Sequence, residues 1–107
     1  MNEIKSYATV QKWIANVNRY YNLSDEEWEP RLRTLEDFCR ALDQDPDAII
    51  AEALADRAEK IDYMRRLRSF AREQNANAYA AHDLENVVRS FFIHNGARVV
   101  TRPYTES

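Results

Sequence analysis

The stretch LSDEEWEPRLRTLEDFCRAL, residues 23–42, carries the clearest structural signal in the chain. Ser24 is followed three residues later by Glu27, which is the spacing of a capping box, and this predicts that a helix begins here. Apolar residues then recur at helical spacing and indicate a face that packs against other elements. They are Trp28, Leu32, Leu35, Phe38, Cys39 and Leu42. The stretch therefore predicts a long amphipathic helix that needs partners to cover its apolar face.

The remaining sequence supplies those partners as further helices. The 107 residues include one glycine and three prolines, which is too few for many tight turns. Apolar periodicity predicts helices at about 7–21, 57–74 and 78–95, and a short helix that begins at Pro46. The expected N-caps are Asp45, Asp56 and Asn77, and the expected C-terminal stop is Gly96. We therefore expect an all-α fold, a small bundle of four to five helices.

The same periodicity assigns residues to the core. In the first helix it places Tyr20 and Tyr21 on the apolar face with Trp13, and in the third helix it places Leu54 there. The single cysteine, Cys39, falls on an apolar stripe, and we expect it to be a buried small hydrophobic residue.

Charge is distributed unevenly along the chain, although the net charge is only −3. Residues 24–56 contain three bases and eleven acids, whereas residues 57–107 contain nine bases and six acids. An anionic partner should therefore meet the two ends of the chain and not its middle. In the acidic middle, pairs at i, i+4 spacing such as Glu29 and Arg33 are expected to neutralise each other on the outer face of their helix.

Two of the predicted helices carry basic residues without acids beside them. Lys12 and Arg19 share the outer face of the first helix, and Arg65, Arg68 and Arg72 are spaced i, i+3 and i+7 along the fourth. Like charges this close repel one another unless an anion binds, so these residues are candidate phosphate contacts. The alternative is that salt screens the charges and that nothing binds.

The last predicted helix contains LENVVRSFFIHNG, residues 84–96, and has two faces. His82, Asn86 and Arg89 are spaced i, i+4 and i+7 on the face opposite the apolar residues. Because such side chains contact phosphates and base edges, they are candidate DNA contacts. The alternative is an ordinary polar surface without a partner. The apolar face, expected in the core, consists of Leu84, Val87, Val88, Phe91 and Phe92.

No motif indicates catalysis, a metal or a cofactor. His82 and His94 lie twelve residues apart, with no cysteine or paired carboxylate at ligand spacing. There is no glycine-rich phosphate loop and no serine in a nucleophile elbow. We expect these residues to catalyse no reaction and to bind no metal, cofactor or small-molecule ligand.

No apolar run approaches the roughly 18 residues that a membrane helix needs. The residues after Met1 lead directly into a mixed polar and apolar pattern, which is unlike a signal peptide. We therefore expect a cytoplasmic protein that does not contact a membrane.

Three stretches, in this order, resemble a known family. LSDEEWEPRLRTLEDFCRAL, residues 23–42, resembles the motif that opens the core-binding domain of tyrosine recombinases, the phage integrase family. NAYAAHDLENVVRSFFIHNG, residues 77–96, looks like the last helix of that domain, with a polar cap, an aliphatic stripe, a basic residue before two phenylalanines, and a glycine. TVQKWIANV, residues 9–17, fits the entry to the domain. The resemblance covers about residues 8–104.

This resemblance implies a SAM-like helical domain that grips one side of a DNA recombination site, alongside other recombinase protomers on double-stranded DNA. The last helix of such a domain lays its polar face along the DNA. Arg89 matches the family's basic residue before the phenylalanines, and His82 matches a position where a basic residue is common. The expected boundaries are a helical domain at 1–102 and the beginning of a linker at 103–107.

Strand cleavage in this family belongs to a separate C-terminal domain. Tyr104 falls at the linker, so we do not expect it to be the nucleophile. The parent protein is expected to continue past Ser107 for roughly 150 residues or more, the size of another domain.

Two positions depart from the family's pattern. Glu27 stands where a threonine is common, and Arg31 stands where an aromatic residue is common. The acidic residues at 25–29 also lie where the family often approaches phosphate. We therefore expect DNA binding by this domain to be weak and strongly salt-dependent.

A different class of function fits the same sequence. SAM-like bundles often bind other proteins or themselves, and the acidic middle of this chain could dock a basic partner. The alternative is therefore a helical protein–protein interaction module.

Overall fold

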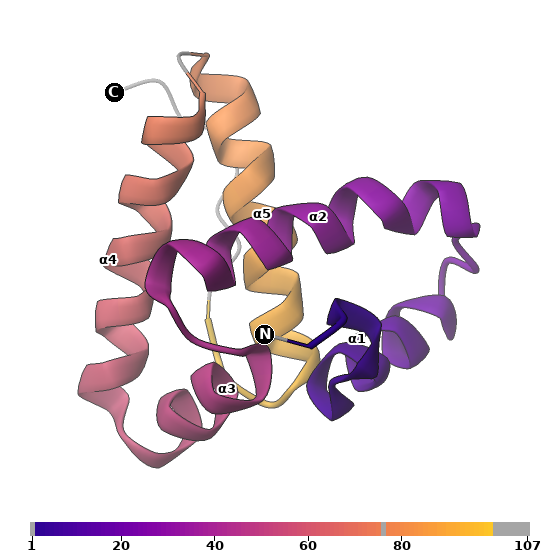
Figure 1. The fold of residues 1–107 in the computed structure, drawn as a ribbon, viewed down its shortest axis with the longest axis horizontal. Helices are drawn as coiled ribbons and strands as arrows, with labels where there is room; N and C mark the ends of the chain where they lie inside the picture. The colour runs from indigo at the N-terminus through magenta and orange to yellow at the C-terminus, as the bar shows by residue number, and fades with distance from the viewer. Residues whose placement is uncertain (1, 76, 100–107) are drawn as a thin grey trace.

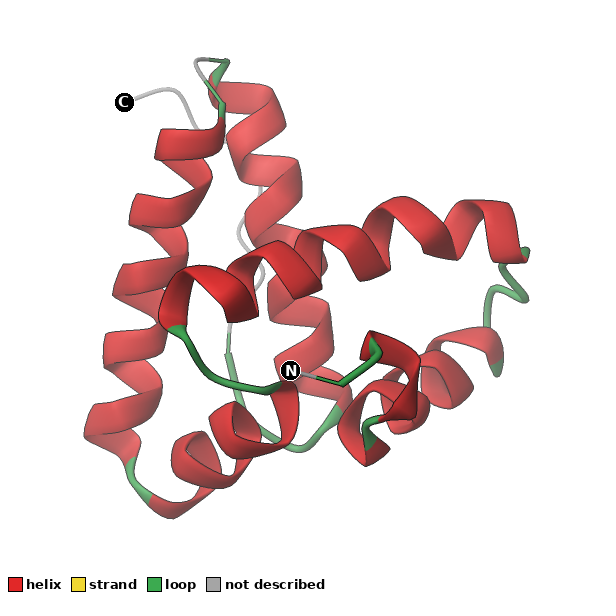
Figure 2. Ribbon diagram, viewed as in Figure 1, coloured by secondary structure: helices red, strands yellow, loops and turns green. Residues whose placement is uncertain are grey.

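All five helices predicted from the sequence are present in the computed structural model, which describes residues 2–75 and 77–99. No strand occurs among these described residues, and the expected all-α fold class is confirmed (Figure 2). The helices are η1 Ile4–Ser6, a short 3₁₀-helix that was not predicted, and α1 Ala8–Asn18, α2 Asp25–Leu42, α3 Pro46–Ala55, α4 Arg57–Gln74 and α5 Ala78–His94. The linker expected at 103–107 and Tyr104 lie outside the described residues.

Four of the helices begin where the sequence places a capping residue. Ser24 and Glu27 form the predicted capping box at α2: the Glu27 N–H donates to Ser24 Oγ at 3.2 Å, and the Ser24 N–H donates to Glu27 Oε1 at 3.3 Å. Asp45, Asp56 and Asn77 accept backbone N–H groups in the first turns of α3, α4 and α5. Each cap satisfies donors that a helix leaves without partners at its beginning, so these helix starts are fixed locally.

α2 and α5 end in the same way. Just past each helix, one residue adopts a left-handed conformation: Asp43, directly after α2, has a φ of 53°, and Gly96, which follows α5 and its C-cap Asn95, has a φ of 86°. The next residue then donates its N–H back into the last turn, from Gln44 to the Cys39 carbonyl and from Ala97 to the Phe92 carbonyl, both at 3.0 Å. This is a Schellman motif, which favours glycine at the left-handed position. After α2 this position is occupied by Asp43, whose Cβ makes the left-handed conformation less favourable than it would be for glycine.

Replacing Asp43 with glycine is therefore expected to raise the free energy of unfolding by about 0.5–1 kcal/mol, because it relieves the left-handed conformation. It also removes a carboxylate from the negative end of the α2 dipole. The measurement is urea unfolding followed by circular dichroism. Asp43→Ala is the matched control, since it removes the carboxylate but keeps a Cβ. If the two variants gained equally, backbone conformation would not be the cause.

α5 is the central helix of the bundle. It lies antiparallel to α4 and beside it, α2 crosses the pair, and α1 packs against α5 on another side (Figure 1). α3 packs against both α1 and α4 at the end where the chain leaves α5. Because three helices contact α5, more than one side of it is covered.

The core between α1, α2 and α5 is built around Trp13, which is 1% exposed. Its ring meets Trp28 edge-on with centroids 5.1 Å apart, and Phe91 with centroids 5.6 Å apart. The indole N–H donates to Ser90 Oγ at 3.0 Å, which satisfies the polar atom of a buried tryptophan. One residue of α1 thus joins α2 and α5, whose apolar faces the sequence predicted to lie in the core.

Three predicted core residues lie at the surface instead. Tyr20 and Tyr21 are each 74% exposed, because α1 ends at Asn18 and not at residue 21. The Asn18 side-chain oxygen accepts the Leu23 N–H at 2.9 Å and so turns the chain there. Leu54 is 57% exposed because it lies on the side of the last α3 turn that no described residue covers, whereas its neighbour Ala53 is buried.

Candidate nucleic-acid interface

A cleft of about 390 Å³ runs along α4, beside α5 and the segment that follows it. Nine described residues line this cleft; six of them carry a positive charge and none carries a carboxylate. The cations are Arg57, Lys60, Arg65 and Arg68 of α4, Arg89 of α5, and Arg98 beyond it. We call this feature the cationic cleft. Six cations around one hollow create a positive potential that attracts phosphate and other oxyanions.

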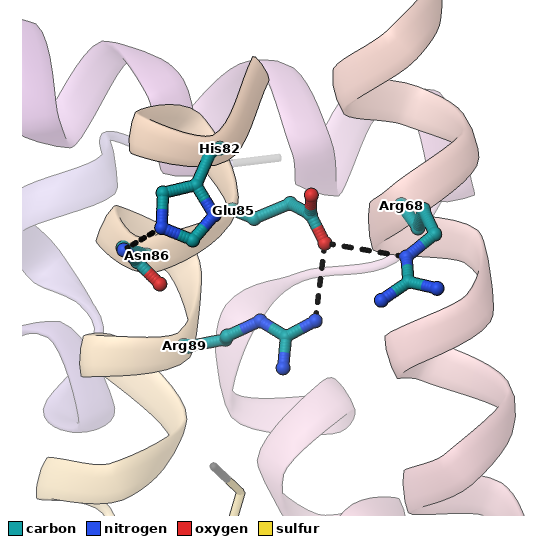
Figure 3. Close-up of polar contacts among 5 residues, drawn as sticks. All are labelled: Arg68, His82, Glu85, Asn86 and Arg89. Atoms are coloured by element: carbon teal, nitrogen blue, oxygen red, sulfur yellow. Dashed lines mark hydrogen bonds and ion pairs between the residues drawn. The ribbon is translucent and has the colours of Figure 1, made fainter. Parts of the chain in front are cut away.

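One carboxylate bridges the two helices at the cationic cleft. Glu85 Oε1 lies 3.0 Å from Arg89 Nη2 within α5, and 3.7 Å from Arg68 Nε across the gap to α4 (Figure 3). The side chains of Glu85 and Arg89 are 14% and 7% exposed, whereas that of Arg68 is 40% exposed. The bridge therefore holds a buried guanidinium at the base of the cleft and a half-exposed guanidinium at its wall.

The structure corrects the expected position of Arg89. The sequence placed it on the polar reverse face of α5, yet it is buried among the core residues of that helix. The physical reason is the central place of α5, because α4, α1 and α2 cover it from several sides and leave no full outer face. Glu85, four residues earlier, supplies the charge partner that makes this burial tolerable.

His82 and Asn86 are also not on an open face. Both are partly buried, and Asn86 Nδ2 lies 3.1 Å from His82 Nε2 (Figure 3). The Asn86 side-chain oxygen is buried and has no hydrogen-bond partner among the described residues. The expected row of three solvent-facing polar side chains on α5 is therefore wrong, and the helix offers them to a partner only in part.

Two of the three arginines predicted to form a stripe on the fourth helix lie at the surface as expected. Arg65 and Arg72 are exposed on α4. Arg68 differs, because Glu85 of the neighbouring helix approaches it, so the expectation of a stripe without an acid fails at that position. Sequence spacing within one helix could not reveal an acid that reaches across from another.

The first-helix candidates lie elsewhere. Lys12 and Arg19 are exposed, but neither lines the cationic cleft, and α1 lies beside α5, away from α4 (Figure 1). The structure therefore brings Arg65, Arg68 and Arg89 together and leaves Lys12 and Arg19 apart from them.

Three of the six cleft cations, Arg57, Lys60 and Arg98, were not predicted from the sequence. Arg57 precedes Arg65 by eight residues, close to two helical turns, so a longer reading of the α4 stripe would have included it. Lys60 lies beside that stripe, one turn after Arg57. Arg98 had no periodic signal, because it follows the end of α5 and only the path of the chain brings it to the cleft.

Other reactive groups in the described residues are held in structural roles. Burial, together with the nearby carboxylates of Asp45 and Glu36, raises the pKa of the Cys39 thiol to about 12, so it stays protonated near neutral pH. Burial and a 2.7 Å hydrogen bond to Glu52 raise the pKa of the Tyr63 hydroxyl well above its ordinary value. Neither group is an available nucleophile.

The described residues contain no group of three or more histidine, cysteine or acidic residues that could hold a metal ion. Within the same residues, no helix combines the length and the apolar character that a bilayer span demands.

Comparison of the chain with protein-family models, with curated proteins and with solved structures finds no match.

Proposed function

We propose that this chain is a DNA-binding domain that holds the phosphate backbone of a duplex along the cationic cleft. This is the role of the core-binding domain of the tyrosine recombinases, which the sequence resembles. The observation that carries the proposal is the lining of the cleft: of its nine described lining residues, six are cations from α4, α5 and the segment after α5, and none of the nine carries a carboxylate. The proposal covers DNA binding alone and assigns no role in strand cleavage to the described residues.

The length of the α4 stripe suits a backbone of repeated phosphates. From Arg57 to Arg72 the helix rises about 22 Å, at about 1.5 Å per residue. That length spans several phosphates of one strand, which follow one another at about 3.4 Å along the duplex axis. Arginine suits this contact because its planar fork of donors can bind two phosphate oxygens at once.

The candidate contacts are graded by their positions. The proposed phosphate contacts in the cleft are Arg57, Lys60, Arg65, Arg68 and Arg98, with Arg89 at its base. Arg72 does not line the cleft but is exposed further along α4, and it is proposed as a contact next to the cleft. Lys12 and Arg19 are proposed as secondary contacts for a duplex that extends past α5. His82 and Asn86 are half-buried, so a base contact from them is proposed only as a minor part of the interface.

The test is duplex binding measured by fluorescence anisotropy over a range of salt concentrations. Arg65→Gln combined with Arg72→Gln is expected to weaken binding about tenfold and to reduce the salt slope by about 1.8, since each phosphate contact contributes about 0.9. The matched control is Arg33→Gln combined with Arg40→Gln on α2, which changes the net charge equally. Arg33 and Arg40 are already paired with Glu29 and Glu36 at 2.9 and 3.5 Å.

A ¹⁵N-HSQC titration with the same duplex would locate the surface. Shifts are expected on α4 and near Arg98. Shifts confined to α2, no shifts at low salt, or equal weakening by both double variants would count against the proposal.

A second candidate function is supported by an acidic groove, which is lined mainly by residues of the acidic middle of the chain. This groove, about 420 Å³ in volume, lies between η1 and α2. It is lined by five carboxylates, those of Glu3, Asp25, Glu26, Glu29 and Glu36, and by two cations, Lys5 and Arg33. A protein-interaction module would use it to dock a basic partner. A mass that rises with concentration in light scattering, without any response to DNA, would favour this second function.

A further inference from the structure

Glu85 contacts both arginines of the bridge through the same oxygen. The Arg89 Nη2 and Arg68 Nε groups that it contacts belong to residues lining the cationic cleft, and they are donors of the kind that bind phosphate. A phosphate entering the cleft therefore meets donors that already face an anion. In the free protein, the Glu85 carboxylate already occupies the Arg68 and Arg89 donors that would bind the phosphate.

We propose that the base of the cationic cleft is a site for a single phosphate group, held by Arg65, Arg68 and Arg89, and that Glu85 is an internal competitor that weakens it. The inference rests on the proposed DNA-binding function and deepens it, because the bound phosphate would be one of the duplex backbone. It adds a defined position for that phosphate and a residue that sets its affinity.

The burial of Arg89 is what makes the base of the cleft a site and not merely a charged surface. Its side chain is 7% exposed, so its charge is screened by water less than that of an exposed arginine. A phosphate that reaches it loses water but gains a stronger interaction in the lower local dielectric. Arg65 is exposed at the cleft wall and Arg68 is half-exposed, so the entrance is open to an anion.

Competition by Glu85 follows from charge and position. Its carboxylate repels a phosphate that approaches Arg68 and Arg89, and it engages the donors that the phosphate needs. Glu85→Gln removes the charge while an amide oxygen can still accept from Arg89. This substitution should strengthen phosphate binding, whereas an ordinary structural salt bridge would give no such gain.

The test uses the whole 107-residue chain with inorganic pyrophosphate and, separately, with a short DNA duplex. Binding is followed by ¹⁵N-HSQC, including the arginine side-chain Nε–H signals. Pyrophosphate should shift the signals of Arg65, Arg68 and Arg89 in a saturable manner. Glu85→Gln should tighten its binding roughly fivefold, by removing one negative charge within contact distance of the phosphate.

The matched control is Asp83→Asn, which removes the same charge from an exposed position on the same helix. It should tighten binding less than twofold, because an exposed charge away from the site is largely screened. Equal effects of Glu85→Gln and Asp83→Asn would overturn the inference, since the gain would then reflect net charge alone. Should Glu85→Gln fail to fold, Arg65→Gln takes its place, and unchanged pyrophosphate binding by that variant would overturn the site.

The two ligands separate this inference from the proposed function. Duplex binding on α4 without saturable pyrophosphate binding would leave the DNA-binding proposal standing and overturn the single-phosphate site. Pyrophosphate binding with the expected variant pattern, but no duplex binding, would support the site and contradict the DNA-binding function.

Discussion

Replacing Trp13 with alanine is expected to lower the free energy of unfolding by about 3–5 kcal/mol, the range for removing a large buried aromatic side chain. Trp13 is 1% exposed and contacts Trp28 of α2 and Phe91 of α5. The change would open a cavity where three helices meet and would remove the hydrogen bond to Ser90. Since a domain of this kind is stabilised by about 5–15 kcal/mol in total, the variant should lose a large part of its stability.

Urea unfolding followed by circular dichroism measures this loss. Two controls separate its causes. Ser90→Ala removes only the hydrogen-bond acceptor and should cost about 1–2 kcal/mol. Tyr21→Ala removes an aromatic ring that is 74% exposed and should change stability by less than about 0.5 kcal/mol. A loss at Tyr21 comparable to that at Trp13 would contradict the arrangement of α1 described above.

Replacing Glu85 with leucine is expected to cost about 3–5 kcal/mol, because it leaves the buried guanidinium of Arg89 without the carboxylate beside it. Arg68, with a side chain 40% exposed, can turn to solvent and should contribute little to the loss. Glu85→Gln keeps an oxygen near Arg89 and should lose less than the leucine variant.

A double-mutant cycle with Arg89→Met tests whether the pair itself is responsible. The double variant Glu85→Leu with Arg89→Met should recover most of the stability, since two apolar side chains of similar volume replace a buried ion pair. The coupling free energy, obtained from urea unfolding of all four proteins, is expected to exceed about 1 kcal/mol. Additive losses would show that Glu85 and Arg89 do not depend on each other.

Much of the secondary structure could be predicted, because its signals are local. Ser24, Asp45, Asp56 and Asn77 each cap a helix within one turn, and Gly96 ends α5 through its own backbone freedom. These effects depend on neighbours in sequence, so reading the chain is enough to find them. The end of α1 was misplaced, because the Asn18 contact that turns the chain involves a residue of the following loop.

The candidate site could be predicted only in part. Arg65 and Arg72 were found because α4 has one exposed side and its stripe follows helical periodicity. Arg89 was assigned to the wrong environment, because periodicity within α5 assumes one covered face and one open face. The structure covers α5 with three helices, which periodicity cannot indicate.

The sequence by itself determined that this protein is a small bundle of capped helices, with an excess of acids in its middle and of bases toward its C-terminal half. Tertiary structure alone decided that Arg89 lies in the interior, that Glu85 stands between it and Arg68, and that Arg98 returns to α4. The physical reason is that caps and periodicity act within a few residues of one helix. A cleft and its counterion, by contrast, depend on which helices lie side by side.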